Sequence, residues 1–212
     1  MELRNLLNHL ITVRCPYCRK RIHYKNPSCD KCAKKFPKRP LTRYTRGVYF
    51  CVSSLPYKEP FKTALWNFKF SKERDYSNQM GMLIARDIKA IYGDRHFDFI
   101  TAVPIRKKDL AIREYNQSEF LARAISKELS IPYTEALIKK RYTKPQRKQQ
   151  AVDRMKNVQG AYKVISKDIV RNKDILIIDD VITTGCTLGE CAETLTKSGA
   201  RSVHCSTLCS VV

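Results

Sequence analysis

The chain has 212 residues, of which 43% are hydrophobic and 9% aromatic, so it can bury one α/β core with a small appendage and is not intrinsically disordered. No apolar run approaches the roughly 18 residues of a membrane helix, and the acidic Glu2 argues against a secretion signal, so we expect a cytoplasmic protein without membrane insertion. The formal net charge of +21 at pH 7 favours a polyanionic partner.

The positive charge is concentrated in two segments. Residues 1–48 contain 13 Lys and Arg against 2 Asp and Glu, and residues 139–173 contain 12 against 2. The remaining sequence is close to neutral. Two separate basic blocks favour a nucleic-acid partner, with Lys-rich solvated loops as the alternative.

The cysteine spacing predicts a metal site near the N-terminus. Two CxxC pairs, CPYC and CDKC, are separated by ten residues. Four soft thiolates with no open coordination position suit a structural Zn²⁺ ion, whereas a redox CxxC usually occurs singly. The predicted ligands are Cys15, Cys18, Cys29 and Cys32.

A Pro-bounded linker at residues 37–40 divides the chain into a zinc-binding module of residues 1–40 and a larger domain of residues 41–212. In the larger domain, Pro60 opens a segment whose apolar face contains Leu65, Trp66 and Phe68, and we expect Trp66 to lie in the core. The other predicted elements are strands at 47–53 and 97–104 and helices at 76–92 and 117–129. This alternation predicts an α/β fold with a parallel sheet flanked by helices.

The segment 175–187, ILIIDDVITTGCT, predicts a phosphate site. An apolar strand is followed by Asp179 and Asp180, which suit a vicinal diol or a bound cation. A loop with three hydroxyls then leads into a helix, and Gly185 allows a phosphate to approach the backbone closely. The predicted phosphate-binding residues are Thr183, Thr184, Gly185 and Thr187.

These residues predict a ligand with a phosphate beside a ribose diol. The sequence contains neither GxxxxGK[ST] nor GxGxxG, so P-loop and Rossmann sites are excluded. The alternative is a core strand that ends in solvated acids before a helix cap.

Residues 175–187 resemble the phosphoribosyl-pyrophosphate (PRPP) motif of type I phosphoribosyltransferases. The resemblance implies that Asp179 and Asp180 are the catalytic-site carboxylates that contact the ribose hydroxyls, with Mg²⁺ bound alongside PRPP if the site is active. It also implies that the TTGxT loop holds the 5′-phosphate.

The four-cysteine module joined to this domain further resembles the ComF competence-protein family, as do residues 68–70 (FKF), 103–104 (VP) and 113–117 (REYNQ). This resemblance selects Lys69 and Arg113 as pyrophosphate-loop residues and residues 139–160 as a flexible hood. One departure is Glu114, where the family usually has Gly, and a carboxylate there is expected to strain the turn or repel pyrophosphate.

The ComF resemblance implies a protein of natural competence and DNA uptake that binds single-stranded DNA, with competence or recombination proteins as partners. We expect bases to stack on Tyr115, Tyr142 or Tyr162. Two alternatives stay open. One is an active phosphoribosyltransferase that transfers the pentosyl group to a base or amine, and the other is a PRPP-sensing regulator that binds nucleic acid.

Overall fold

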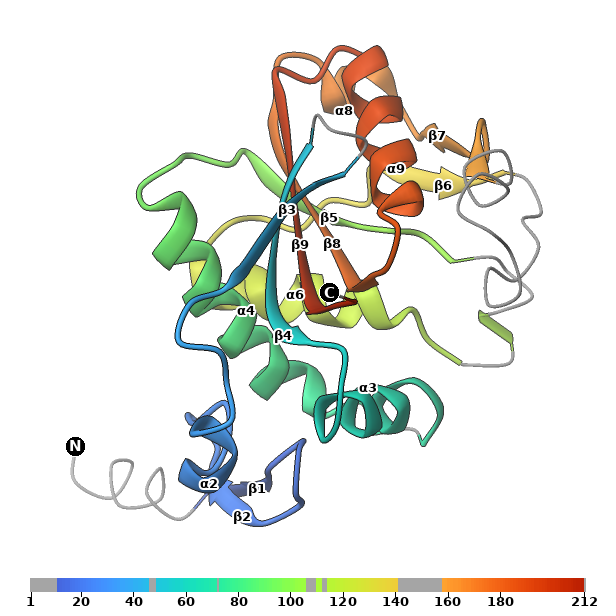
Figure 1. Ribbon diagram of the computed structural model, residues 1–212. Coiled ribbons are helices and arrows are strands. Elements are labelled where there is room, and N and C mark those ends of the chain that lie inside the picture. Colours follow the sequence, from blue (N-terminus) through green and yellow to red (C-terminus); the bar gives the residue numbers. More distant parts are fainter. Residues whose placement is uncertain are drawn as a thin grey trace.

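The computed structural model describes residues 11–45, 49–71, 73–105, 110–111, 114–140 and 158–211. A central five-stranded sheet organises these residues (Figure 1). In spatial order its strands are β3 (Leu41–Thr45), β4 (Tyr49–Pro56), β9 (Ser202–Ser210), β8 (Asp174–Ile182) and β5 (Phe99–Ala102). The edge strand β3 pairs antiparallel to β4, and the other neighbouring strands are parallel.

Strand β8 begins with a continuous apolar run because both faces of the strand are buried. Successive side chains of a strand point to opposite faces, so Leu176 and Ile178 pack in one hydrophobic cluster and Ile175 and Ile177 in the other. All four are fully buried. The predicted parallel sheet covered on both faces is thereby confirmed.

Different elements cover the two faces of the sheet (Figure 1). Helices α4 (Tyr76–Tyr92) and α6 (Gln117–Leu129) supply one cluster. Helix α9 (Cys186–Lys197) supplies the other, together with the hairpin of β6 (Leu137–Lys139) and β7 (Tyr162–Val164). The short helix α8 (Lys167–Val170) leads from this hairpin to β8.

Helix α3 (Phe61–Phe70) corrects the sequence prediction for the one tryptophan of the chain. Leu65 and Phe68 are buried as expected, but Trp66 is 54% exposed. The buried positions of α3 follow the i, i+3, i+4, i+7 pattern of one helix face, and Trp66 lies outside it. Because Trp66 stands among other apolar residues, the sequence did not show that it lies outside the buried face of the helix.

The cysteine module packs against α3 through aromatic rings. The module consists of the hairpin β1 (Thr12–Arg14) and β2 (Arg21–His23) followed by the one-turn helix α2 (Asp30–Ala33). Its Tyr17 ring lies edge-on to Phe36 and to Phe61, the first residue of α3, with centroid distances of 5.3 and 5.5 Å. The core of the module is therefore continuous with the cluster under α4 and α6.

Among the described residues, no helix has both the length and the apolar character that crossing a membrane requires.

Candidate ligand site at the carboxyl ends of the strands

The four cysteines predicted to bind metal converge on one point. Their sulfur atoms all lie within 4.8 Å of one another, and Cys18 Sγ is 3.4 Å from Cys29 Sγ. Tetrahedral zinc with Zn–S bonds of about 2.3 Å requires sulfurs about 3.8 Å apart, so the donor set and its spacing fit Zn²⁺. Three of the four side chains are buried and only Cys18 is exposed, which suits a structural site closed to substrate.

The acidic pair lies inside β8 rather than after it. The prediction ended the apolar strand before Asp179, but β8 continues to Ile182 because its pairing with β9 extends to Ser210. Adjacent strand residues face opposite sides, so Asp179 and Asp180 reach different neighbours. The two carboxylates therefore have different hydrogen-bond and ion-pair partners, although they are neighbours whose charges interact.

Asp179 is held by the start of α6. The Ser118 hydroxyl donates to Asp179 Oδ1 at 2.7 Å, and the Asp180 backbone N–H donates to the same oxygen at 2.9 Å. Burial, followed by the charge of neighbouring Asp180, raises the pKa of Asp179 to about 7. This carboxyl therefore changes charge near neutral pH, which is a feature of functional sites.

Asp180 is paired with the lysine that the resemblance assigned to pyrophosphate. Lys69 Nζ lies 2.7 Å from Asp180 Oδ1, and the two side chains are only 16% and 10% exposed. Lys69 comes from the end of α3, so this ion pair joins that helix to the centre of the sheet. The structure thus brings Lys69 to the acidic pair.

Residues 115–117 hold the end of α3 in place. The Tyr115 hydroxyl donates to the carbonyl oxygen of Phe68, and the Gln117 side-chain amide donates to that of Lys69 at 3.4 Å. Tyr115 and Tyr162 are only 3% and 4% exposed, so they cannot stack on bases as predicted. Their rings are needed in the core.

Asn116 caps α6 and ties it to the end of β5. Its side-chain oxygen accepts the Ser118 N–H at 3.2 Å, and its side-chain amide donates to the carbonyl oxygen of Val103 at 3.1 Å. The sequence analysis predicted the helix at 117–129 but did not identify Asn116 as its N-cap, and this signal could have placed Ser118 in the first turn of the helix.

Glu114 adopts a backbone conformation that favours glycine. Its φ is +64°, and its carboxylate pairs with Arg74 at 3.1 Å. A left-handed conformation costs a non-glycine residue about 1–2 kcal/mol. Having Glu instead of Gly at position 114 therefore strains the backbone. Arg113, the neighbouring pyrophosphate candidate, lies outside the described residues, as does most of the predicted hood.

The loop between β8 and α9 is braced by the edge strand β3. Gly185 has φ +77°, and a Cβ there would lie 3.0 Å from the side chain of Thr45. The Thr45 hydroxyl donates to the Gly185 carbonyl oxygen at 2.6 Å, and Arg43 Nη1 donates to that of Thr183 at 2.9 Å. Sequence reasoning missed Arg43 and Thr45, because they are 140 residues from the loop and no local motif marks them.

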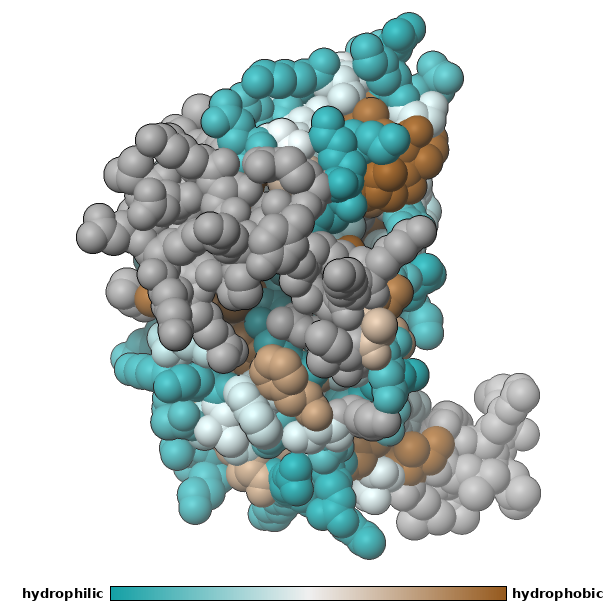
Figure 2. Space-filling view, turned by 90° about the vertical axis from the view of Figure 1, so that its right-hand side faces the viewer, coloured by the Kyte–Doolittle hydropathy of each residue, from teal (hydrophilic) through white to brown (hydrophobic). Residues whose placement is uncertain are grey.

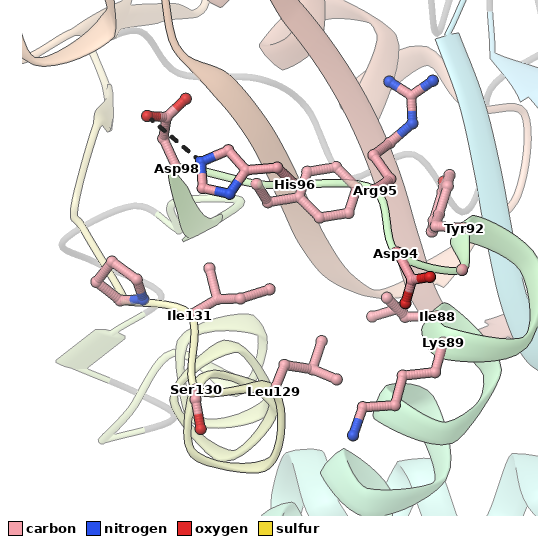
Figure 3. A pocket seen from close by; sticks show the side chains of 13 residues that line it. Ile88, Lys89, Tyr92, Asp94, Arg95, His96, Asp98, Leu129, Ser130 and Ile131 are labelled. Atoms are coloured by element: carbon pink, nitrogen blue, oxygen red, sulfur yellow. Dashed lines mark ion pairs between the residues drawn. The ribbon is translucent and has the colours of Figure 1, made fainter.

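A separate pocket of about 400 Å³ lies at the amino-terminal ends of the strands, between the loop that follows α4 and the end of α6 (Figure 3). It contains the ion pair of His96 Nε2 with Asp98 Oδ1 at 3.9 Å. Ligands of open parallel sheets bind at the opposite, carboxyl-terminal ends of the strands, where the acidic pair and the loop meet. We therefore take the carboxyl ends as the candidate site.

Known proteins are similar to this chain over most of its length. A model of the phosphoribosyl transferase domain matches residues 116–211. Competence protein F of Haemophilus influenzae is 28% identical over 90% of this chain and 94% of its own length. The DNA utilization protein YhgH of Escherichia coli is 27% identical over 92% and 83%, and competence protein ComFC of Bacillus subtilis is 26% identical over 98% and 80%. The chain is a homologue of these competence and DNA utilization proteins.

The ComF resemblance drawn from the sequence is thus confirmed. So is the fold class, which combines a type I phosphoribosyltransferase-like sheet with an N-terminal four-cysteine cluster. These relatives are matched over at least 80% of their length and at least 90% of this chain, so the likeness is not confined to the phosphoribosyl transferase domain at residues 116–211.

Proposed function

We propose that this ComF homologue is a DNA-handling protein of natural competence that binds single-stranded DNA in the cytoplasm. The observation that carries the proposal is the near full-length likeness to relatives named for competence and for DNA utilization. In this proposal residues 1–40 are a structural zinc module, and residues 41–212 are a phosphoribosyltransferase-like domain.

The surface charge of the module supports a polyanionic partner. Ten cationic side chains are exposed among residues 11–40, and Asp30 is the one acidic residue in that range. The exposed cations are Arg14, Arg19, Lys20, Arg21, Lys25, Lys31, Lys34, Lys35, Lys38 and Arg39. Such a surface attracts phosphates without reading sequence, so the binding would be largely non-specific.

The carboxyl-end site supports a second ligand, PRPP, on the same scaffold. In this proposal the loop of Thr183, Thr184, Gly185 and Thr187 binds the 5′-phosphate at the start of α9. Asp179 and Asp180 accept from the ribose hydroxyls, and Mg²⁺ would supply charge neutralisation for the pyrophosphate. Lys69 exchanges its carboxylate partner for a ligand oxygen as the diol binds.

Salt-dependent binding of a labelled oligothymidine tests the DNA proposal. Neutralising about five phosphates gives a log–log slope of roughly −3.5 between 50 and 300 mM salt in fluorescence anisotropy. The zinc-loaded full chain is used, with duplex DNA of equal length as the comparison. An affinity that is absent, or that barely changes with salt, contradicts the proposal.

Phosphoribosyl transfer is the second candidate function, favoured by the match to the phosphoribosyl transferase domain over residues 116–211. Pyrophosphate release from Mg²⁺·PRPP in the presence of a base or amine would support it. PRPP binding without turnover, accompanied by a change in DNA affinity, would instead support the regulator.

A further inference from the structure

Helix α3 presents an exposed aromatic ridge. Trp66 and Phe70 are 54% and 42% exposed, and their rings pack at a centroid distance of 5.4 Å with an angle of 46°. Lys62 is exposed one turn before Trp66, so the three side chains follow the i, i+4, i+8 row of the helix. In Figure 2 a small brown-tinted patch lies at the height of α3, next to pale and hydrophilic surface.

The ridge lies between the two regions that the proposed function assigns to phosphates. At the start of α3, Phe61 packs on Tyr17 and Phe36 of the cationic module. At the end of α3, Lys69 pairs with Asp180 of the carboxyl-end site. Helix α3 thus connects the module to the carboxyl-end site, and a strand that contacts both regions has a direct route along it.

The chemistry of the ridge suits bases better than an apolar protein surface. Trp66 and Phe70 expose flat rings in the same helix row as exposed Lys62, and stacking surface beside a cation is found in proteins that bind single strands. The two residues are separated by about 6 Å along the helix axis, so the ridge offers stacking surface at two points along a strand. The charge of Lys62 complements the phosphates of the same strand.

We propose that Trp66 and Phe70 form a base-stacking platform for single-stranded DNA. The proposal rests on the DNA-binding function above and names the residues that meet the bases. Of the three tyrosines predicted from the sequence to stack on bases, Tyr115 and Tyr162 are buried and Tyr142 lies outside the described residues.

The experiment uses the fact that Trp66 is the only tryptophan of the chain. Its fluorescence is followed while oligothymidine is titrated into the zinc-loaded protein, and anisotropy of a labelled oligonucleotide records total binding in parallel. We expect the fluorescence to be quenched with the same midpoint as the anisotropy change. Inorganic polyphosphate, which has charge but no bases, should bind without this quenching.

Variants separate stacking from charge. Trp66→Leu should weaken oligothymidine binding about tenfold and leave the salt slope unchanged, because no cation is lost. Tyr44→Leu is the matched control, since Tyr44 is an aromatic side chain 61% exposed on β3, and it should bind like the wild type. Circular dichroism and the zinc content establish that both variants are folded.

The outcomes distinguish this inference from the proposed function. Salt-dependent oligonucleotide binding without quenching, and with Trp66→Leu unchanged, overturns the platform while the DNA-binding function stands. Equal quenching by polyphosphate also overturns stacking. No oligonucleotide binding in the anisotropy measurement overturns the proposed function and the platform together.

Discussion

The loop before α9 and the end of α3 lie on two sides of the acidic pair in β8, and different interactions hold them in place. On the α9 side, the loop is braced by Thr45 and Arg43 of strand β3, which donate to the loop's own carbonyl oxygens. On the α3 side, the cations are engaged with carboxylates of the protein, Lys69 with Asp180 and Arg74 with Glu114. The backbone of the loop is already held in place without a ligand. On the α3 side, Lys69 must leave Asp180 before it can bind a ligand oxygen.

This difference indicates that ligand binding loses free energy mainly on the α3 side. A loop whose backbone is already fixed needs little ordering when a phosphate binds, so its hydrogen bonds contribute to affinity directly. An ion pair between largely buried groups must be broken and replaced with a partner of equal quality. We therefore expect substitutions on the α3 side to change both stability and ligand affinity, and substitutions in the loop to act through backbone geometry.

The largest expected effect comes from removing Lys69. Lys69→Met leaves the carboxylate of Asp180 buried without its cation, which should lower the free energy of unfolding by about 3 kcal/mol. For a chain of this size the melting temperature should fall by about 6–12 °C. The double variant Lys69→Met/Asp180→Asn should recover most of the loss in thermal melts, and a double variant as unstable as the single one would show that the ion pair is not the cause.

Asp179 makes stability depend on pH. Its pKa in the folded protein is raised from 3.8 to about 7, so its contribution is fully present below about pH 4 and is lost as the pH rises through 7. Urea unfolding at pH 5 and pH 8 should therefore show a loss of a few kcal/mol that is absent in Asp179→Asn. An identical pH dependence in wild type and variant would contradict the assignment.

Gly185→Ala tests the bracing of the loop by β3. Alanine at φ +77° costs about 1–2 kcal/mol, and its Cβ would also lie 3.0 Å from Thr45. Gly160→Ala is the matched control, because Gly160 has φ +66° but no atom of the described residues lies within 4 Å of the added Cβ. Chemical denaturation should show Gly185→Ala to be the less stable of the two, and equal losses would mean that Thr45 does not constrain the loop.

The smallest expected effect is a gain at Glu114. Glu114→Gly removes the strain of φ +64° and one exposed ion pair of little net value, so stability should rise by about 0.5 kcal/mol. The same change removes a carboxylate next to Arg74 and should tighten Mg²⁺·PRPP binding several-fold in calorimetry. Glu114→Asn removes the charge but keeps a side chain that tolerates positive φ, and affinity should rise equally if repulsion is the cause.

The parts of the site that were predictable from the sequence are encoded locally. The CxxC pairs, the apolar run before Asp179 and the TTGxT loop are each recognisable within a few consecutive residues. Contacts made across the fold were not predictable. Strand β3 supports the loop from 140 residues away.

Trp66 shows a different limit of sequence interpretation. It stands beside Leu65 in an apolar run, and hydrophobicity alone placed it in the core. The helix turns by about 100° per residue, which moves Trp66 to the solvent face while Leu65 stays buried. Trp66, which we predicted to lie in the core, is therefore exposed and can contact a partner.

Calorimetric titration of Mg²⁺·PRPP into the zinc-loaded chain tests the carboxyl-end site most directly, with Asp179→Asn/Asp180→Asn as the comparison. The account predicts one equivalent bound by the wild type and at least 100-fold weaker binding by the folded double variant, about 2.7 kcal/mol by the usual conversion. No binding by the folded wild type, or equal binding by both proteins, would contradict the assignment of the acidic pair and loop as one ligand site.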